Sequence, residues 1–141
     1  MRELTGALRW ICWFWAAAAA AVHLSFGGTG FPEQIQMRGF HLLIFTPLLF
    51  ILYPAFGSSP KHRPSLLDWV WAVASGIPHA WVMWNWMAVA DRMEYVDPFT
   101  PVMMVLGITA IVTLLEAIRR AVEPGLAWMV GGSLAYMQWG Y

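Results

Sequence analysis

The chain has 141 residues, of which 60% are hydrophobic and 11% are charged. An average soluble domain carries about 25% charged residues, so this composition argues against a water-soluble protein. Eight basic and eight acidic residues balance each other, which excludes the strongly basic surface that a nucleic-acid partner requires. We therefore expect one all-α, polytopic transmembrane domain over residues 1–141.

Apolar runs recur along the chain at the length that a membrane helix needs, which is about 20 residues for about 30 Å of hydrocarbon. Short segments rich in charge, glycine and proline separate these runs. The last run is short and contains paired glycines, so it either spans or is only partly inserted. We predict four to five spans, at residues 10–26, 39–56, 66–90, 99–115 and 125–141.

The basic residues predict the orientation. A cytoplasmic N-terminus places most of them inside, as the positive-inside rule favours: Arg2, Arg9, Lys61, Arg63, Arg119 and Arg120. A cleaved signal peptide is the alternative reading of the first run, because basic residues precede it and alanines at 16–21 follow. Trp10, Trp13 and Trp15 instead favour an interfacial anchor, and the alanines favour close helix packing.

Polar residues within the runs have structural explanations. Pro47 and Pro78 each remove one backbone hydrogen bond from a predicted helix. Asp68 and Asp97 begin the third and fourth runs, where a carboxylate caps a helix. Asn85 is expected to form an interhelical hydrogen bond worth about 0.6–2 kcal/mol.

Glu116 precedes Arg119 and Arg120 by three and four residues, so one helical face carries all three side chains. At the cytoplasmic boundary of a membrane, such a cluster binds lipid phosphates and anchors the helix, or it docks another subunit. Both readings stay open.

Four histidines raise the possibility of b-type haem, because paired imidazoles on facing helices are its usual axial ligands. A haem would need a pair at similar depth, such as His41 and His79. The ten tryptophans indicate aromatic belts at the membrane surfaces, with a stacking site for an aromatic ligand as the alternative. The sequence holds no nucleotide-binding loop, zinc-spaced cysteine pair or nucleophile elbow, so we expect no catalytic, substrate-binding or metal site and no cofactor.

Two blocks and the final run resemble the small membrane subunit (Q-type) of TRAP transporters of the TAXI type. The first is MRGFHLLIFTPLLFILYP at residues 37–54, with matches at Arg38, His41, Leu42, Tyr53 and Pro54. The second is residues 97–120, where Asp97 opens a span, Gly107 lies within it, and LLEAIRR matches a Leu-Glu-Ala-x-Arg-Arg signature through Glu116, Arg119 and Arg120. The final run, with Tyr136 and Gly140, is similar to the family's segment leading towards the large subunit. AVEPG departs from the family, which more often has a glycine sooner.

The resemblance implies a non-enzymatic scaffold subunit of a tripartite secondary transporter in a bacterial or archaeal cytoplasmic (inner) membrane. Such a transporter imports organic acids or amino acids on a sodium or proton gradient. The implied partners are the large permease subunit, a periplasmic substrate-binding protein and membrane lipids, with the transport sites in the large subunit. The chain is then a free-standing subunit or part of a longer permease. Alternatives are an electron-transfer subunit holding b-type haem and an autonomous small transporter.

Overall fold

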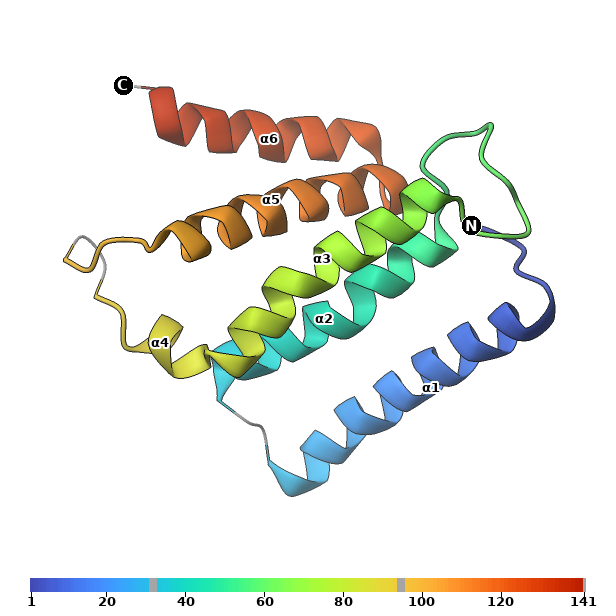
Figure 1. Cartoon of the computed structure of the whole chain (residues 1–141), viewed down its shortest axis with the longest axis horizontal. Coiled ribbons are helices and arrows are strands. Elements are labelled where there is room, and N and C mark those ends of the chain that lie inside the picture. Colours follow the sequence, from blue (N-terminus) through green and yellow to red (C-terminus); the bar gives the residue numbers. More distant parts are fainter. Residues whose placement is uncertain (31–32, 94–95, 141) are drawn as a thin grey trace.

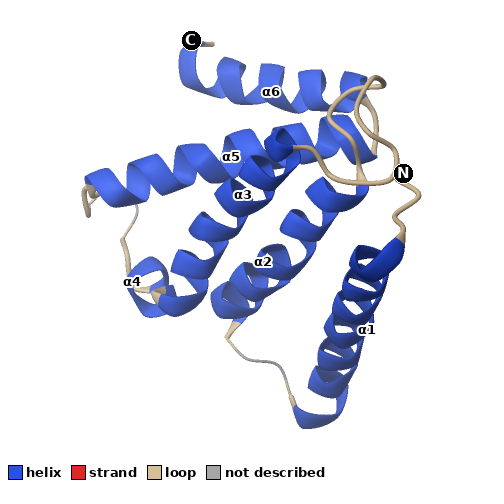
Figure 2. Ribbon diagram, turned by 45° about the vertical axis from the view of Figure 1, so that its right-hand side comes forward, coloured by secondary structure: helices blue, strands red, loops and turns tan. Residues whose placement is uncertain are grey.

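The computed structural model describes residues 1–30, 33–93 and 96–140, which fold into helices and connecting loops without strands (Figure 2). The fold class is therefore all-α, as predicted. The helices, in chain order, are α1 (Gly6–Thr29), α2 (Gln34–Leu52), α3 (Leu66–Trp84), α4 (Trp86–Ala90), α5 (Pro101–Ala121) and α6 (Pro124–Trp139).

The long helices lie side by side in chain order (Figure 1). α2 and α3 form the central pair, α5 packs against α3, and α6 packs against α5. The N-terminus, the α2–α3 loop and the α5–α6 turn lie at one end of the molecule. We call this the basic end, because it carries Arg2, Arg9, Lys61, Arg63, Arg119 and Arg120.

The core lies where α2, α3 and α5 meet near the basic end. It contains Leu48, Phe50 and Ile51 of α2, Ala72 of α3 and Ala117 of α5. Phe50 has no exposed surface and stacks on Trp71 with 5.8 Å between ring centroids. Full burial of such a side chain contributes about 1.5–3 kcal/mol, which makes this cluster the main apolar contact among the three helices.

Gly39 allows α2 to approach α3 closely at the opposite end. A Cβ atom built on Gly39 would lie 2.9 Å from the backbone nitrogen of Met83 and 3.1 Å from the carbonyl oxygen of His79. Real Cβ atoms almost never come this close to backbone. The close packing of α2 on α3 therefore requires glycine at this position.

Two of the predicted spans extend beyond the C-terminal ends of the helices. The second was expected to reach residue 56, but α2 ends at Leu52, because Pro54 disfavours helical geometry at Tyr53. The third was expected over residues 66–90, but it breaks at Asn85 into α3 and α4. The Asn85 side chain donates to the Trp81 carbonyl within its own helix (3.0 Å), so this contact is not the interhelical bond that the sequence suggested.

The fourth predicted span is shifted towards the C-terminus. α5 begins at Pro101 and continues to Ala121, six residues beyond the expected end at residue 115. Its cap is Thr100, whose hydroxyl accepts from the Met103 amide (3.2 Å), and Pro101 suits the first helical position. Asp97 lies outside the helix, so the prediction that it caps this span is wrong. α6 covers most of the fifth run, whose last residue, 141, lies outside the described residues.

Within the described residues, three helices, α1, α2 and α5, are long and apolar enough to cross a membrane, fewer than the four to five predicted spans. Four tryptophans, Asp68 and His79 lower the mean hydropathy of α3, and α6 has only 16 residues. The three long apolar helices are compatible with a multi-pass membrane protein.

Candidate functional site

A fully buried carboxylate, Asp68, is the centre of an ion network at the basic end. Asp68 lies in the first turn of α3, where it forms a capping box with Ser65. Its Oδ2 accepts from the Ser65 amide (2.7 Å) and hydroxyl (2.6 Å). Asp68 therefore caps its helix as predicted, but it also accepts hydrogen bonds from two arginines that come from opposite ends of the chain.

Arg2 is the first of these arginines. Its guanidinium donates to Asp68 Oδ2 at 2.5 Å, and both side chains have no exposed surface. The remaining donors reach backbone carbonyls: Nη1 bonds Ile51 O at 2.8 Å and Phe50 O at 3.3 Å, and Nε bonds Pro60 O at 3.0 Å. The last carbonyls of a helix have no partner within it and carry partial negative charge. Arg2 thus closes the C-terminal end of α2 as well as neutralising Asp68.

Arg120 of α5 is the second arginine, and it bridges the two acids. Its Nη1 donates to Asp68 Oδ1 at 2.7 Å, and its Nε donates to Glu116 Oε1 at 2.7 Å. The guanidinium carbon lies 4.9 Å from the centre of the Phe50 ring and 5.9 Å from that of Trp71. Apolar and aromatic groups therefore surround a salt bridge from which water is excluded.

Arg119 connects the network to the surface. It forms a bidentate pair with Glu116, at 2.6 Å and 2.7 Å, and its Nη2 donates to Ala55 O at 2.9 Å. Its side chain is 34% exposed and that of Glu116 is 16% exposed, whereas that of Arg120 is completely enclosed. The spacing argument for this trio is confirmed. If lipid or another subunit binds here, it reaches Arg119 and the edge of Glu116, not Arg120.

The network is strongly coupled because most of it is shielded from water. Three guanidinium groups and two carboxylates, those of Arg2, Arg119, Arg120, Asp68 and Glu116, leave one net positive charge. Removing one partner of a buried pair typically costs about 3–5 kcal/mol, since a charge is left without compensation. The network joins the N-terminal segment, the end of α2, the start of α3 and the end of α5.

The other residues singled out from the sequence lie in different places. Tyr53 is the C-cap of α2, and its carbonyl accepts from Arg120 Nη1 at 3.4 Å, while Pro54 follows it half-buried. Arg38 is exposed on α2 near the opposite end. Asp97 is exposed in the loop before α5, where its carboxylate accepts from the Met93 amide at 2.8 Å.

The histidines pair differently from the haem hypothesis. His41 Nδ1 lies 3.1 Å from Nε2 of His23, so this contact joins α1 to α2. His79 is buried on α3, and its Nδ1 lies 2.6 Å from the carbonyl of Ser75. The pair that the haem reading needs, His41 with His79, is therefore not the pair that the fold brings together. Among the described residues, no group of three or more histidine, cysteine or acidic side chains could hold a metal ion.

Sequence reasoning missed two members of the network. Ser65 could have been found, because Ser-x-x-Asp before an apolar run has the spacing of a capping box. Arg2 was counted only for orientation, and its partner lies 66 positions away in sequence. No local pattern predicts such a contact.

No family model matches the chain, and no curated protein or solved structure matches it.

Proposed function

We propose that the chain is the small membrane scaffold subunit of a TRAP-type transporter of the TAXI class, paired with a large permease subunit. The observation that carries this proposal is the meeting of the two blocks that resemble that family. Arg120 of the second block donates to the Tyr53 carbonyl of the first, and the same guanidinium donates to the buried Asp68. Through these bonds Arg120, which is part of the family resemblance, connects α5 to α3 and to the end of α2. Such a contact between helices suits a structural role in the membrane.

The apolar exterior also supports a scaffold. Large apolar side chains are exposed along α1, α5 and α6, including Trp10, Phe14, Val105, Ile108 and Trp128. α6 buries none of its residues against the rest of the chain. Such surfaces are stable only in contact with lipid or with the helices of a partner.

In this proposal the chain crosses the inner membrane four or five times with its basic end in the cytoplasm. α3 has 19 residues and is about 28 Å long, which is close to the thickness of the hydrocarbon core. α6 is shorter, about 24 Å, and either thins the bilayer locally or is supported by the partner. The large subunit binds the substrate and the coupling ion and makes the transport movement. A periplasmic binding protein delivers organic acids or amino acids.

The test is purification of the tagged chain from native membranes in mild detergent, with mass spectrometry of what accompanies it. We expect a large polytopic permease in near-equal amount. The Arg119→Gln variant changes the one guanidinium of the network that is partly exposed. Arg63→Gln provides a control on an exposed arginine at the same end that lies outside both blocks. Recovery of the wild-type chain alone, or together with redox proteins, would refute the proposal.

A further inference from the structure

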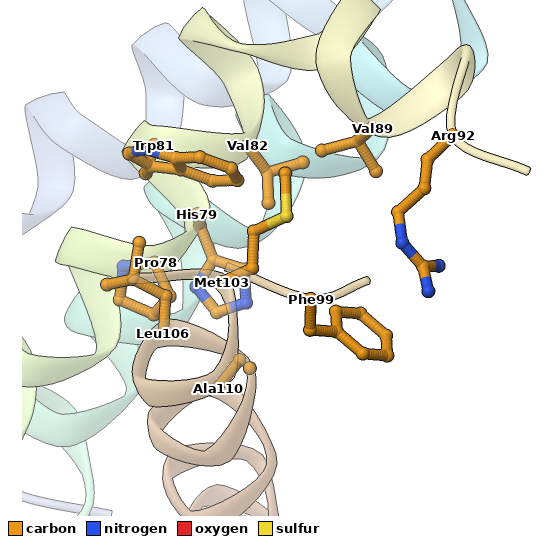
Figure 3. Close-up of a pocket in the computed structure, with 11 residues that line it drawn as sticks. Pro78, His79, Trp81, Val82, Val89, Arg92, Phe99, Met103, Leu106 and Ala110 are labelled. Atoms are coloured by element: carbon orange, nitrogen blue, oxygen red, sulfur yellow. The ribbon is translucent and has the colours of Figure 1, made fainter. Parts of the chain in front are cut away.

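A cavity of about 190 Å³ lies between α3, α4, the loop before α5 and the first half of α5 (Figure 3). Its walls are mostly apolar, with Trp81, Val82, Phe99, Met103 and Leu106 among the lining residues. An apolar cavity of about 150 Å³ is sufficient to take up benzene. This cavity therefore has room for a single substituted six-membered ring, with aromatic and thioether groups suited to contact its faces and edges.

His79 gives the cavity a hydrogen-bond acceptor. The residue is only 5% exposed and lines the cavity, where Figure 3 shows the imidazole among the other lining side chains. Its Nδ1 lies 2.6 Å from the Ser75 carbonyl, which can only accept, so this nitrogen carries the proton. In the neutral ring Nε2 then has a free lone pair. Among the described residues it has no hydrogen-bond donor, so a ligand with a hydroxyl group would supply one.

Arg92 gives the rim of the cavity a donor. Its guanidinium lies 3.8 Å from the centre of the Phe99 ring and donates from Nη2 to the Asp97 carbonyl at 3.1 Å. Its Nε is buried and has no acceptor among the described residues. Arg92 lies in a segment, residues 91–97, whose sequence has one basic and three acidic residues, and this negative formal charge favours a neutral oxygen over a carboxylate as the ligand group.

We propose that this cavity binds a neutral monocyclic aromatic compound with a hydroxyl group. The hydroxyl donates to His79 Nε2, the ring fills the space beside Trp81 and Met103, and a second oxygen on the ring accepts from Arg92 Nε. An apolar pocket with a few polar groups in its wall is the usual form of a small-molecule site. The inference does not depend on the transporter proposal, because it uses only groups of this chain.

The experiment compares two probes that differ in the hydroxyl group. We would titrate 4-fluorophenol and 4-fluorotoluene into the protein in nanodiscs, follow the ¹⁹F resonances, and subtract the partitioning into empty nanodiscs. Three variants test the site. His79→Asn keeps a donor for Ser75 but, because its side chain is shorter, has no acceptor at the position of Nε2. Ala110→Leu fills the cavity, and Gly131→Ala is a control on α6, where a new Cβ meets no atom within 4 Å.

We expect saturable binding of 4-fluorophenol to the wild type and to Gly131→Ala. His79→Asn should weaken 4-fluorophenol about fivefold and change 4-fluorotoluene less than about twofold, as expected for one lost hydrogen bond. Ala110→Leu should abolish binding of both probes. If that variant does not fold, Gly107→Leu fills the same cavity from a position where a Cβ meets nothing within 4 Å.

Two results would overturn the proposal. Equal signals from the wild type, the filled variants and empty nanodiscs would mean that the probes only partition into lipid. An unchanged affinity of 4-fluorophenol for His79→Asn would mean that the hydroxyl group does not form a hydrogen bond with His79.

Discussion

Asp68→Asn tests whether the buried ion network holds the helices together. The substitution keeps the size of the side chain but removes the charge that compensates Arg2 and Arg120, whose side chains have no exposed surface. It also replaces one acceptor oxygen by an NH₂ group that faces donors. We expect the free energy of unfolding to fall by about 3–5 kcal/mol, which is about a hundredfold to several thousandfold in the unfolding equilibrium.

The measurement is unfolding in mixed micelles with a rising fraction of SDS, followed by tryptophan fluorescence. Asp97→Asn is the matched control, because Asp97 is exposed and accepts one backbone amide, so its loss should cost about 1 kcal/mol or less. Arg2→Gln combined with Asp68→Asn should be less destabilising than the sum of the single changes, with a coupling of about 0.5–3 kcal/mol. If Asp68→Asn matches Asp97→Asn and the double change is additive, the reasoning about the network is wrong.

Three further substitutions can be measured in the same unfolding assay. Gly39→Ala should destabilise by about 1–3 kcal/mol, since its Cβ would come within 2.9 Å of the α3 backbone, whereas Gly131→Ala should be neutral or stabilise by up to about 1 kcal/mol. Thr100→Ala should cost about 1 kcal/mol by removing the cap of α5, and Asp97→Ala should leave that cap intact. Arg2→Met should cost about 2–3 kcal/mol, less than Asp68→Asn, because the carboxylate retains Arg120.

Each of these has a result that contradicts it. An unchanged stability of Gly39→Ala would mean that α2 and α3 do not approach as closely as the structure has them. A larger loss for Asp97→Ala than for Thr100→Ala would restore Asp97 as the helix cap. Arg2→Met with wild-type stability would mean that the N-terminal segment is not docked.

Much of the fold could be predicted because its signals are local. Apolar runs and the glycine and proline segments between them predicted five helical regions, and the spacing of Glu116, Arg119 and Arg120 predicted a shared helical face. The errors occur at helix ends, where a single residue decides. Asn85 breaks the third run and bonds back to its own helix, and Pro54 makes the second helix end earlier than predicted.

The site was less predictable because its contacts are distant in sequence. The sequence predicted that Asp68 only caps its helix. Arg120 contacts Asp68 only because α5 packs against α3. The sequence suggested a pair of His41 and His79. In the fold, His41 instead contacts His23, and His79 lines a cavity. The partner of a polar side chain depends on how helices meet, which hydropathy does not report.

The distances in sequence within the network also bear on the order in which it forms during synthesis. Arg2 and Asp68 are 66 positions apart, and Arg120 follows Asp68 by a further 52. A chain made from its N-terminus therefore contains both Arg2 and Asp68 before Arg120 exists. Asp68 Oδ1 gains its guanidinium donor only once α5 has been made and has packed against α3.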